Sequence, residues 1–149
     1  MARQSVFYNP EKDLSENYTE EFRVETVMVK DVTNLRVEHH YWRDPGGELW
    51  GDFDAPMENV HKDFEAYRKE KNFLSPKEIH HIIEKMGLTV RQFADKLGLG
   101  VSTLSQIENN QRIQVKYQDN LFRWANGETF HRQSPDRPKM SLTFNPKDA

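Results

Sequence analysis

The stretch Leu88–Asn110, LTVRQFADKLGLGVSTLSQIENN, contains the pattern from which the fold of the C-terminal half follows. Its first part predicts a short amphipathic helix, because Phe93, Ala94 and Leu97 recur with the spacing of one helical face. Thr89 precedes this run and is a favourable N-cap residue, since its hydroxyl can accept a hydrogen bond from a free backbone N–H.

A glycine-bearing corner follows this helix. Gly98-Leu99-Gly100 interrupts the period, and glycine tolerates the sharp backbone that a helix-to-helix turn requires. A second helix is then predicted, with Leu104 and Ile107 facing inward. Two short helices joined in this way form a helix-turn-helix, the motif that places its second helix in the major groove of DNA.

The outward face of the second helix favours DNA over a protein partner. It carries small side chains, mostly polar, with neither an apolar stripe nor Lys or Arg, so base recognition would depend on neutral groups. Some domains of this fold bind only protein, which is the alternative reading. The outward residues are Val101, Ser102, Ser105, Gln106 and Asn109.

Charge is distributed unevenly along the 149 residues, whose formal net charge is −3. Residues 1–74 contain 10 Lys and Arg against 16 Asp and Glu, a net of −6, whereas residues 75–149 contain 11 against 8, a net of +3. DNA phosphates would attract the second half and repel the first, which predicts two modules with different partners. Because +3 is modest, we expect DNA affinity to need a dimer that presents two such surfaces.

The absence of cysteine excludes disulfides and thiolate metal sites and is typical of a reducing compartment. The first residues lack the apolar segment of a signal peptide, and no apolar run approaches the length of a membrane span. We therefore expect a cytoplasmic protein with no membrane partner.

The N-terminal half predicts a small antiparallel sheet. Alternation of apolar and polar residues indicates strands over 22–30 and 35–42. The turn residues Asp44-Pro45-Gly46-Gly47 then precede a third short strand over 48–53. A helix over 56–71 follows, with an amphipathic stripe formed by Met57, Val60, Phe64 and Tyr67.

Two more helices flank the helix-turn-helix. Ser75 and Glu78 fit a capping box around Pro76, and the helix over 76–86 presents Ile79, Ile82, Ile83 and Met86 on one face. A last helix is predicted over 116–126 and ends at Gly127.

The ends of the chain show no helical period. We expect residues 1–20 to form an irregular or mobile arm; the alternative is a short edge strand at Val6, Phe7 and Tyr8. Residues 128–149, with three prolines, are expected to form a flexible tail, with addition of the alternating residues 140–144 to a sheet edge as the alternative. The fold class predicted between them is α+β. A small N-terminal antiparallel β-sheet with a linking helix occupies 21–72, and an all-α, lambda-repressor-like helix-turn-helix domain occupies 73–127.

Several positions resemble the Xre/Cro repressor-like family. Ala94 packs the first helix of the motif, Gly98 makes the turn, and Ile107-Glu108-Asn109 matches the family's closing pattern of a hydrophobic residue, Glu and Asn. The resemblance implies a sequence-specific DNA-binding regulator.

Two longer phrases, EAYRKEKNFLSPKEIHHIIEKMGLT and QVKYQDNLFRW, are similar to the MqsA/YgiT-type antitoxins. The similarity is specific over 60–126 and loose over 22–59. Members of that family join a toxin-binding, zinc-containing N-terminal domain to an Xre-like domain that dimerises and represses its own operon. Their zinc is held by two Cys-x-x-Cys pairs, whereas this chain has Arg43-Asp44-Pro45-Gly46-Gly47 about where the second pair would lie, so we expect that site to be lost.

The resemblance places two base-reading positions at Ser102 and Gln106, four residues apart and therefore on one helix face. Gln can form two hydrogen bonds with adenine, whereas Ser discriminates weakly. The family favours Asn and Arg at these positions, so we expect a different operator. The predicted base-reading residues are Val101, Ser102, Thr103, Ser105 and Gln106, and the predicted phosphate-binding residues are Thr89, Arg91, Asn109, Arg112 and Lys116.

Catalytic and metal chemistry have little support in the sequence. We find no nucleophile paired with a base, no glycine-rich phosphate loop and no paired-carboxylate motif, so an enzyme is not expected. His39 and His40 point to opposite faces of a strand, which suits a shared ion poorly, and His61 with Asp54 or Asp63 is the other arrangement. We expect packed or solvated histidines, with no metal and no cofactor.

The sequence therefore predicts a DNA-binding transcriptional regulator, an antitoxin-like autorepressor of a toxin–antitoxin operon that binds operator DNA as a homodimer through the helix over 101–109. The alternative is a protein-interaction module that neutralises a toxin through its acidic N-terminal half, with the helix-turn-helix serving mainly for dimerisation.

Overall fold

The computed structural model describes residues 2–127 and divides the chain into two compact units, Met1–Phe73 and Leu74–Ala149. The first unit contains an antiparallel sheet of four strands and helix α1, and the described part of the second contains helices α2 to α5. The tail expected over 128–149 lies outside the described residues.

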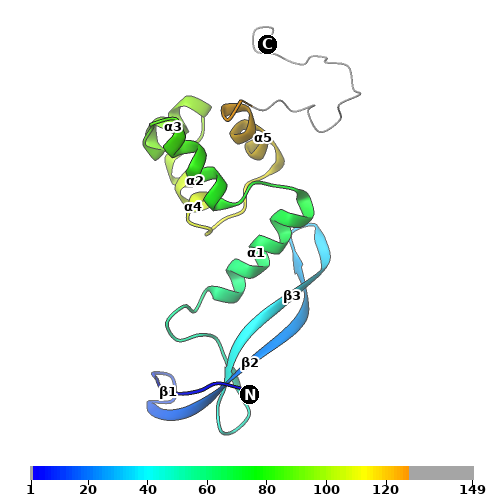
Figure 1. Cartoon of the computed structure of the whole chain (residues 1–149), viewed down its shortest axis with the longest axis vertical. Coiled ribbons are helices and arrows are strands. Elements are labelled where there is room, and N and C mark those ends of the chain that lie inside the picture. The colour runs from blue at the N-terminus through cyan, green and yellow to red at the C-terminus, as the bar shows by residue number, and fades with distance from the viewer. Residues whose placement is uncertain (1, 128–149) are drawn as a thin grey trace. The chain divides into compact units, whose positions relative to one another are not determined.

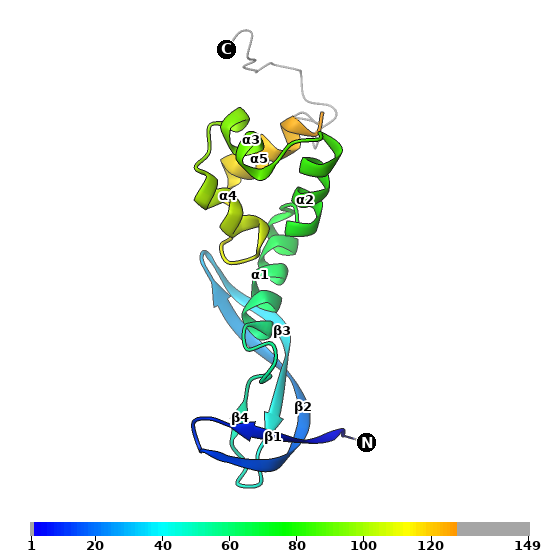
Figure 2. The same ribbon diagram turned by 90° about the vertical axis from the view of Figure 1, so that its left-hand side faces the viewer.

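The sheet is a meander in which each strand pairs with the next along the chain. Its two long strands form a twisted ribbon, with β1 and β4 at one end of it (Figure 2). The predicted strands over 22–30 and 35–42 are present but longer than expected, and the third strand is much shorter than 48–53. The strands are β1 (Gln4–Asn9), β2 (Leu14–Val29), β3 (Val32–Arg43) and β4 (Leu49–Trp50).

The prediction of an irregular arm over residues 1–20 is wrong, because β1 and the first part of β2 occupy that segment. They pair from Gln4↔Thr19 to Asn9↔Leu14. Phe7 places its ring 4.8 Å from that of Trp42, and Tyr18 and Phe53 complete the aromatic cluster. Aromatic contacts between strands stabilise a hairpin that its polar composition did not indicate.

Helix α1 (Glu58–Lys71) runs alongside β3 (Figure 1). The prediction that an apolar stripe buries this helix is largely wrong. Met57 is 52% exposed and Val60 36%, and of the four stripe residues only Tyr67 belongs to the core. Polar side chains make the contacts near its N-terminal end instead. Asn59 binds the backbone of His40 twice, since its Oδ1 accepts from the N–H at 2.8 Å and its Nδ2 donates to the carbonyl at 2.9 Å.

The second unit consists of α2 (Pro76–Lys85), α3 (Val90–Leu97), α4 (Val101–Glu108) and α5 (Lys116–Ala125). These bounds agree closely with the predicted helices. The capping box predicted at Ser75 and Glu78 is present, and Thr89 with Gln92 forms a second one.

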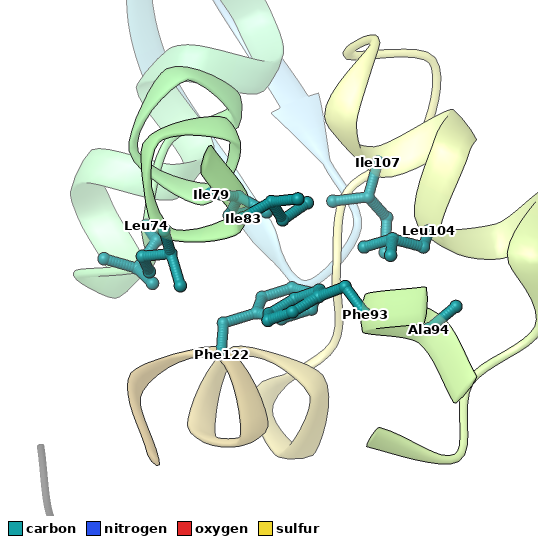
Figure 3. Packing of buried hydrophobic residues seen from close by; sticks show 9 residues of the cluster. Leu74, Ile79, Ile83, Phe93, Ala94, Leu104, Ile107 and Phe122 are labelled. Carbon is teal, nitrogen blue, oxygen red and sulfur yellow. The ribbon is translucent and has the colours of Figure 1, made fainter. Parts of the chain in front are cut away.

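The core of this unit lies among the four helices (Figure 3). Phe93 from α3 and Phe122 from α5 stack with ring centroids 6.2 Å apart, and neither is exposed to solvent. The predicted inward residues of α2, α3 and α4 are confirmed as core, except that Met86 and Leu97 are only partly buried and pack against it. Its buried members are Leu74, Ile79, Ile82, Ile83, Phe93, Ala94, Leu104, Ile107 and Phe122.

A buried polar group joins the start of α2 to α5. Asp119 Oδ1 accepts from the Leu74 N–H at 2.8 Å and from Gln114 Nε2 at 3.0 Å, and its Oδ2 accepts from Arg123 Nε at 2.9 Å. Gln114 Nε2 also donates to the Leu74 carbonyl at 2.8 Å. The network pairs polar groups that would otherwise be costly to bury.

Candidate nucleic-acid interface

The corner between α3 and α4 fixes the direction of the second helix. Gly98 ends α3 with φ of +74°, a left-handed conformation that side chains with a Cβ adopt reluctantly. The Leu99 N–H then donates to the Ala94 carbonyl at 2.8 Å, which closes the last turn of α3. Gly100 is the N-cap of α4, and no side chain caps that helix end.

Helix α4 is amphipathic in the way the motif requires. Leu104 and Ile107 are completely buried against the other helices, while Ser102 and Asn109 are exposed. Thr103, Ser105 and Gln106 are partly exposed.

Val101 differs from the surface position expected of it, because its side chain packs partly against the hydrophobic core. Only part of its surface is therefore left for a thymine methyl group.

The C-terminal end of α4 is fastened to α2 by an ion pair that the sequence analysis did not identify. His80 Nδ1 lies 2.5 Å from Glu108 Oε2, and its Nε2 lies 3.4 Å from Glu84 Oε2. The hydrogen bond to Glu108 raises the pKa of His80 above its ordinary value. Glu108 is the acidic residue of the Ile-Glu-Asn pattern, so this part of the pattern positions the helix.

The five residues predicted to bind phosphate have different surroundings. The Thr89 hydroxyl oxygen already accepts a hydrogen bond from the Gln92 N–H at 3.1 Å as the N-cap of α3, which uses part of its hydrogen-bonding capacity. Arg112 reaches α4, since its Nη1 lies 3.5 Å from Thr103 Oγ1. Asn109 is the C-cap of α4, and its Nδ2 lies 3.4 Å from Ser105 Oγ. Arg91 and Lys116 are exposed on α3 and at the start of α5.

Electrostatics support phosphate binding only moderately. Residues 74–127 contain seven Lys and Arg against five Asp and Glu, a net charge of +2. A surface of this size and charge binds DNA weakly as a single copy, because affinity grows with the number of phosphates neutralised.

Histidines and carboxylates gather instead in the first unit. Ligand-type atoms of His40, Asp52 and Glu58 lie within 4.8 Å of one another, an arrangement that sequence reasoning missed. Protein groups already use them: Glu58 faces His40 Nδ1 at 2.8 Å, and Asp52 accepts from Trp42 Nε1 at 2.9 Å. Asp52 Oδ2 also accepts from two backbone N–H groups. Within the described residues, hydrogen bonding accounts for this cluster.

Comparison with known proteins assigns the second unit to a class. Residues 79–116 match the family described as Helix-turn-helix, a match that begins in α2 and ends at the first residue of α5. It covers about a quarter of the chain. The match supports a DNA-binding regulator of the Xre kind, a class that is not typically enzymatic.

No curated protein and no solved structure matches the chain. Within the described residues, every helix is too short or too polar to cross a membrane.

Proposed function

We propose that this protein is a sequence-specific transcriptional regulator that reads the major groove of operator DNA with α4. The observation that supports this most is the outward face of α4, which presents Ser102, Ser105 and Gln106 beside Arg112 while Leu104 and Ile107 hold the helix in the core. Small polar side chains allow close approach to base edges, and a neighbouring cation can bind the flanking phosphate.

The regulator acts as a homodimer in this proposal. Tyr117 and Trp124 on α5 are 61% and 48% exposed, and their separation of seven residues places them on one face of the helix. An exposed aromatic stripe on a small domain is a suitable surface for self-association. Two copies would double a modest positive charge and match the two half-sites of an operator.

The finer assignment is an antitoxin-like autorepressor of a toxin–antitoxin operon, located in the cytoplasm. Its support is the similarity of residues 60–126 to the MqsA/YgiT-type antitoxins.

The second candidate is a module that neutralises a toxin through the N-terminal unit. Phe22, Val24 and Met28 are each more than half exposed along one face of β2. The same half of the chain has a net charge of −6, which favours a basic partner. Affinity capture from the native host, set against a mobility shift with DNA, separates the two: a basic protein without DNA binding would favour this candidate.

The leading proposal is tested by selecting preferred duplexes from a random library with the full chain, then measuring binding by fluorescence anisotropy. Gln106→Ala should weaken binding to the selected site by about 1–3 kcal/mol and relax its sequence preference, while non-specific binding is unchanged. Gln4→Ala is the control, because it removes the same amide from exposed β1. Equal binding by parent and Gln106→Ala would show that α4 does not read the bases.

A further inference from the structure

We propose that His39 and His40 form a clamp that holds the N-terminal half of α1 on the β2–β3 ribbon, and that loss of the His39 proton loosens it. The residues of this clamp are the two histidines and the carboxylates of Glu20, Glu25, Glu58 and Asp63. All of them lie in the first unit.

Each imidazole is bracketed by one carboxylate from β2 and one from α1. His39 Nδ1 lies 2.6 Å from Glu25 Oε1, and its Nε2 lies 2.6 Å from Asp63 Oδ1. His40 Nε2 lies 2.7 Å from Glu20 Oε2, and its Nδ1 lies 2.8 Å from Glu58 Oε1. The two rings, only 5% and 6% exposed, therefore connect strand and helix on both faces of β3.

The two carboxylates on His39 are best satisfied by a charged ring. A neutral imidazole has one N–H and one lone pair, whereas an imidazolium donates from both nitrogens. If a ring loses its proton, its lone pair faces a carboxylate oxygen at hydrogen-bond distance, and the contact becomes repulsive. Separation of helix and strand lets water solvate the carboxylate that has lost its donor, and is therefore favoured.

The surrounding groups keep the Glu25 carboxylate ionised and bind that of Glu20. Tyr41 Oη donates to Glu25 at 2.5 Å, and hydrogen bonds from Tyr41 and His39 lower the pKa of Glu25. Arg3 donates to Glu20 at 3.0 Å.

Three more charged groups lie near the clamp. Lys62 Nζ lies 3.8 Å from Glu58 Oε2, and Arg23 on β2 lowers the pKa of Glu25 further. The carboxylate of Asp52, from the segment before α1, lies near His40. None of these groups replaces the proton of an imidazole.

Apolar packing contributes little at this end of α1. Met57 and Val60 are exposed, so the polar clamp and Asn59 supply most of the attachment. The C-terminal end is held separately, since Tyr67 Oη and Lys71 Nζ donate to Asp31 at 2.7 and 2.5 Å. Release should therefore be confined to the N-terminal half of the helix.

The direction of the pH dependence follows from His39. Burial by itself would lower the pKa of His39, but its hydrogen bonds to Glu25 and Asp63 outweigh burial and raise the pKa above the ordinary 6.5. A group with a raised pKa in the docked state stabilises that state fully below its ordinary pKa. The stabilisation is lost as the pH rises from 6.5 through the raised value.

Amide hydrogen exchange of the full chain, expressed as protection factors from pH 6 to 9, tests the clamp. Protection of the amides of residues 61–66 should fall by about tenfold per pH unit for each linked proton over this window, then level off. Amides of residues 68–71, at the end of α1 that Tyr67 and Lys71 hold on Asp31, should keep constant protection. Constant protection in both segments, or an equal fall in both, would overturn the proposal.

The double variant His39→Gln/His40→Gln supplies side-chain donors that do not titrate, so protection of α1 should become independent of pH. His61→Gln, on the same helix, should keep the wild-type dependence. A fall that persists in the double variant would contradict the clamp. Should that variant not fold, NMR titration of the wild-type rings decides: His39 and the α1 amides must share one midpoint, and separate midpoints would refute the proposal.

Discussion

Asp119 shows how much a single buried residue contributes to the helix-turn-helix unit. Its two carboxylate oxygens accept from Leu74, Gln114 and Arg123, which lie before α2, before α5 and within α5. No local pattern indicates this role, because an Asp in the first turn of a helix is also common for purely local electrostatic reasons. The partners are distant in sequence and meet only in the folded unit.

Asp119→Ala should lower the free energy of unfolding of the second unit by about 3 kcal/mol, because it removes the acceptor of the buried Leu74 N–H and one acceptor each of Gln114 Nε2 and Arg123 Nε. Urea denaturation followed through the NMR signals of α2 to α5 measures this. The control is Asp95→Ala on the exposed face of α3, expected within about 0.5 kcal/mol of the parent. Equal effects of the two substitutions would disprove the structural role.

Arg112 is the phosphate candidate whose position is best defined, beside Thr103 of the reading helix. Arg112→Ala should weaken binding to all duplexes to a similar extent and reduce the slope of log K against log salt concentration by about 1. Titrations at several salt concentrations measure the slope. Lys77→Ala, which removes one charge from exposed α2, is the control. A loss confined to one DNA sequence would mean that Arg112 reads a base instead.

At the scale of the element, the helices of the second unit were predictable and the N-terminal hairpin was not. Helix caps and an apolar period are local signals, and they located α2 to α5 within a few residues. The β1–β2 pairing depends on contacts between Phe7 and the distant Trp42, which no local pattern reveals. The prediction for α1 failed for a related reason. Met57 and Val60 have helical spacing, but carboxylates and Asn59 make the contact with the sheet.

Part of the candidate site was also predictable from local signals in the sequence. The reading face follows from helix period, which separates Ser102 from Leu104. Val101 and Thr89 could not be placed this way, because their surroundings depend on how the corner folds back on the core and on the capping box. Glu108 belongs to the family pattern, but local signals do not reveal its contact with His80, which lies 28 residues away in sequence.

Gly98 determines how the chain turns between α3 and α4. Gly98→Ala should destabilise the second unit by about 1 kcal/mol, because alanine is strained at φ of +74° although a Cβ would meet nothing within 4 Å. Gly100→Ala is the matched control: its added Cβ meets Thr103 Oγ1 at 3.7 Å, an ordinary contact without backbone strain. Thermal unfolding of both variants measures the difference, and a larger loss for Gly100→Ala would reverse the assignment of the corner.

For the whole molecule, two units of opposite charge are joined in one chain. Residues 1–74 carry −6 and residues 75–149 carry +3, so DNA attracts one part and repels the other. This division suits a regulator whose DNA-binding domain is combined with a separate partner-binding or regulatory module.

The most direct test of DNA reading by α4 is NMR titration of the labelled full chain with its selected duplex. We predict that the backbone and side-chain amide signals of Ser102, Ser105, Gln106 and Asn109 shift or broaden most, together with those of Arg112, while the signals of β2 and β3 stay in place. Changes centred on the sheet, with the α4 signals unmoved, would contradict the account.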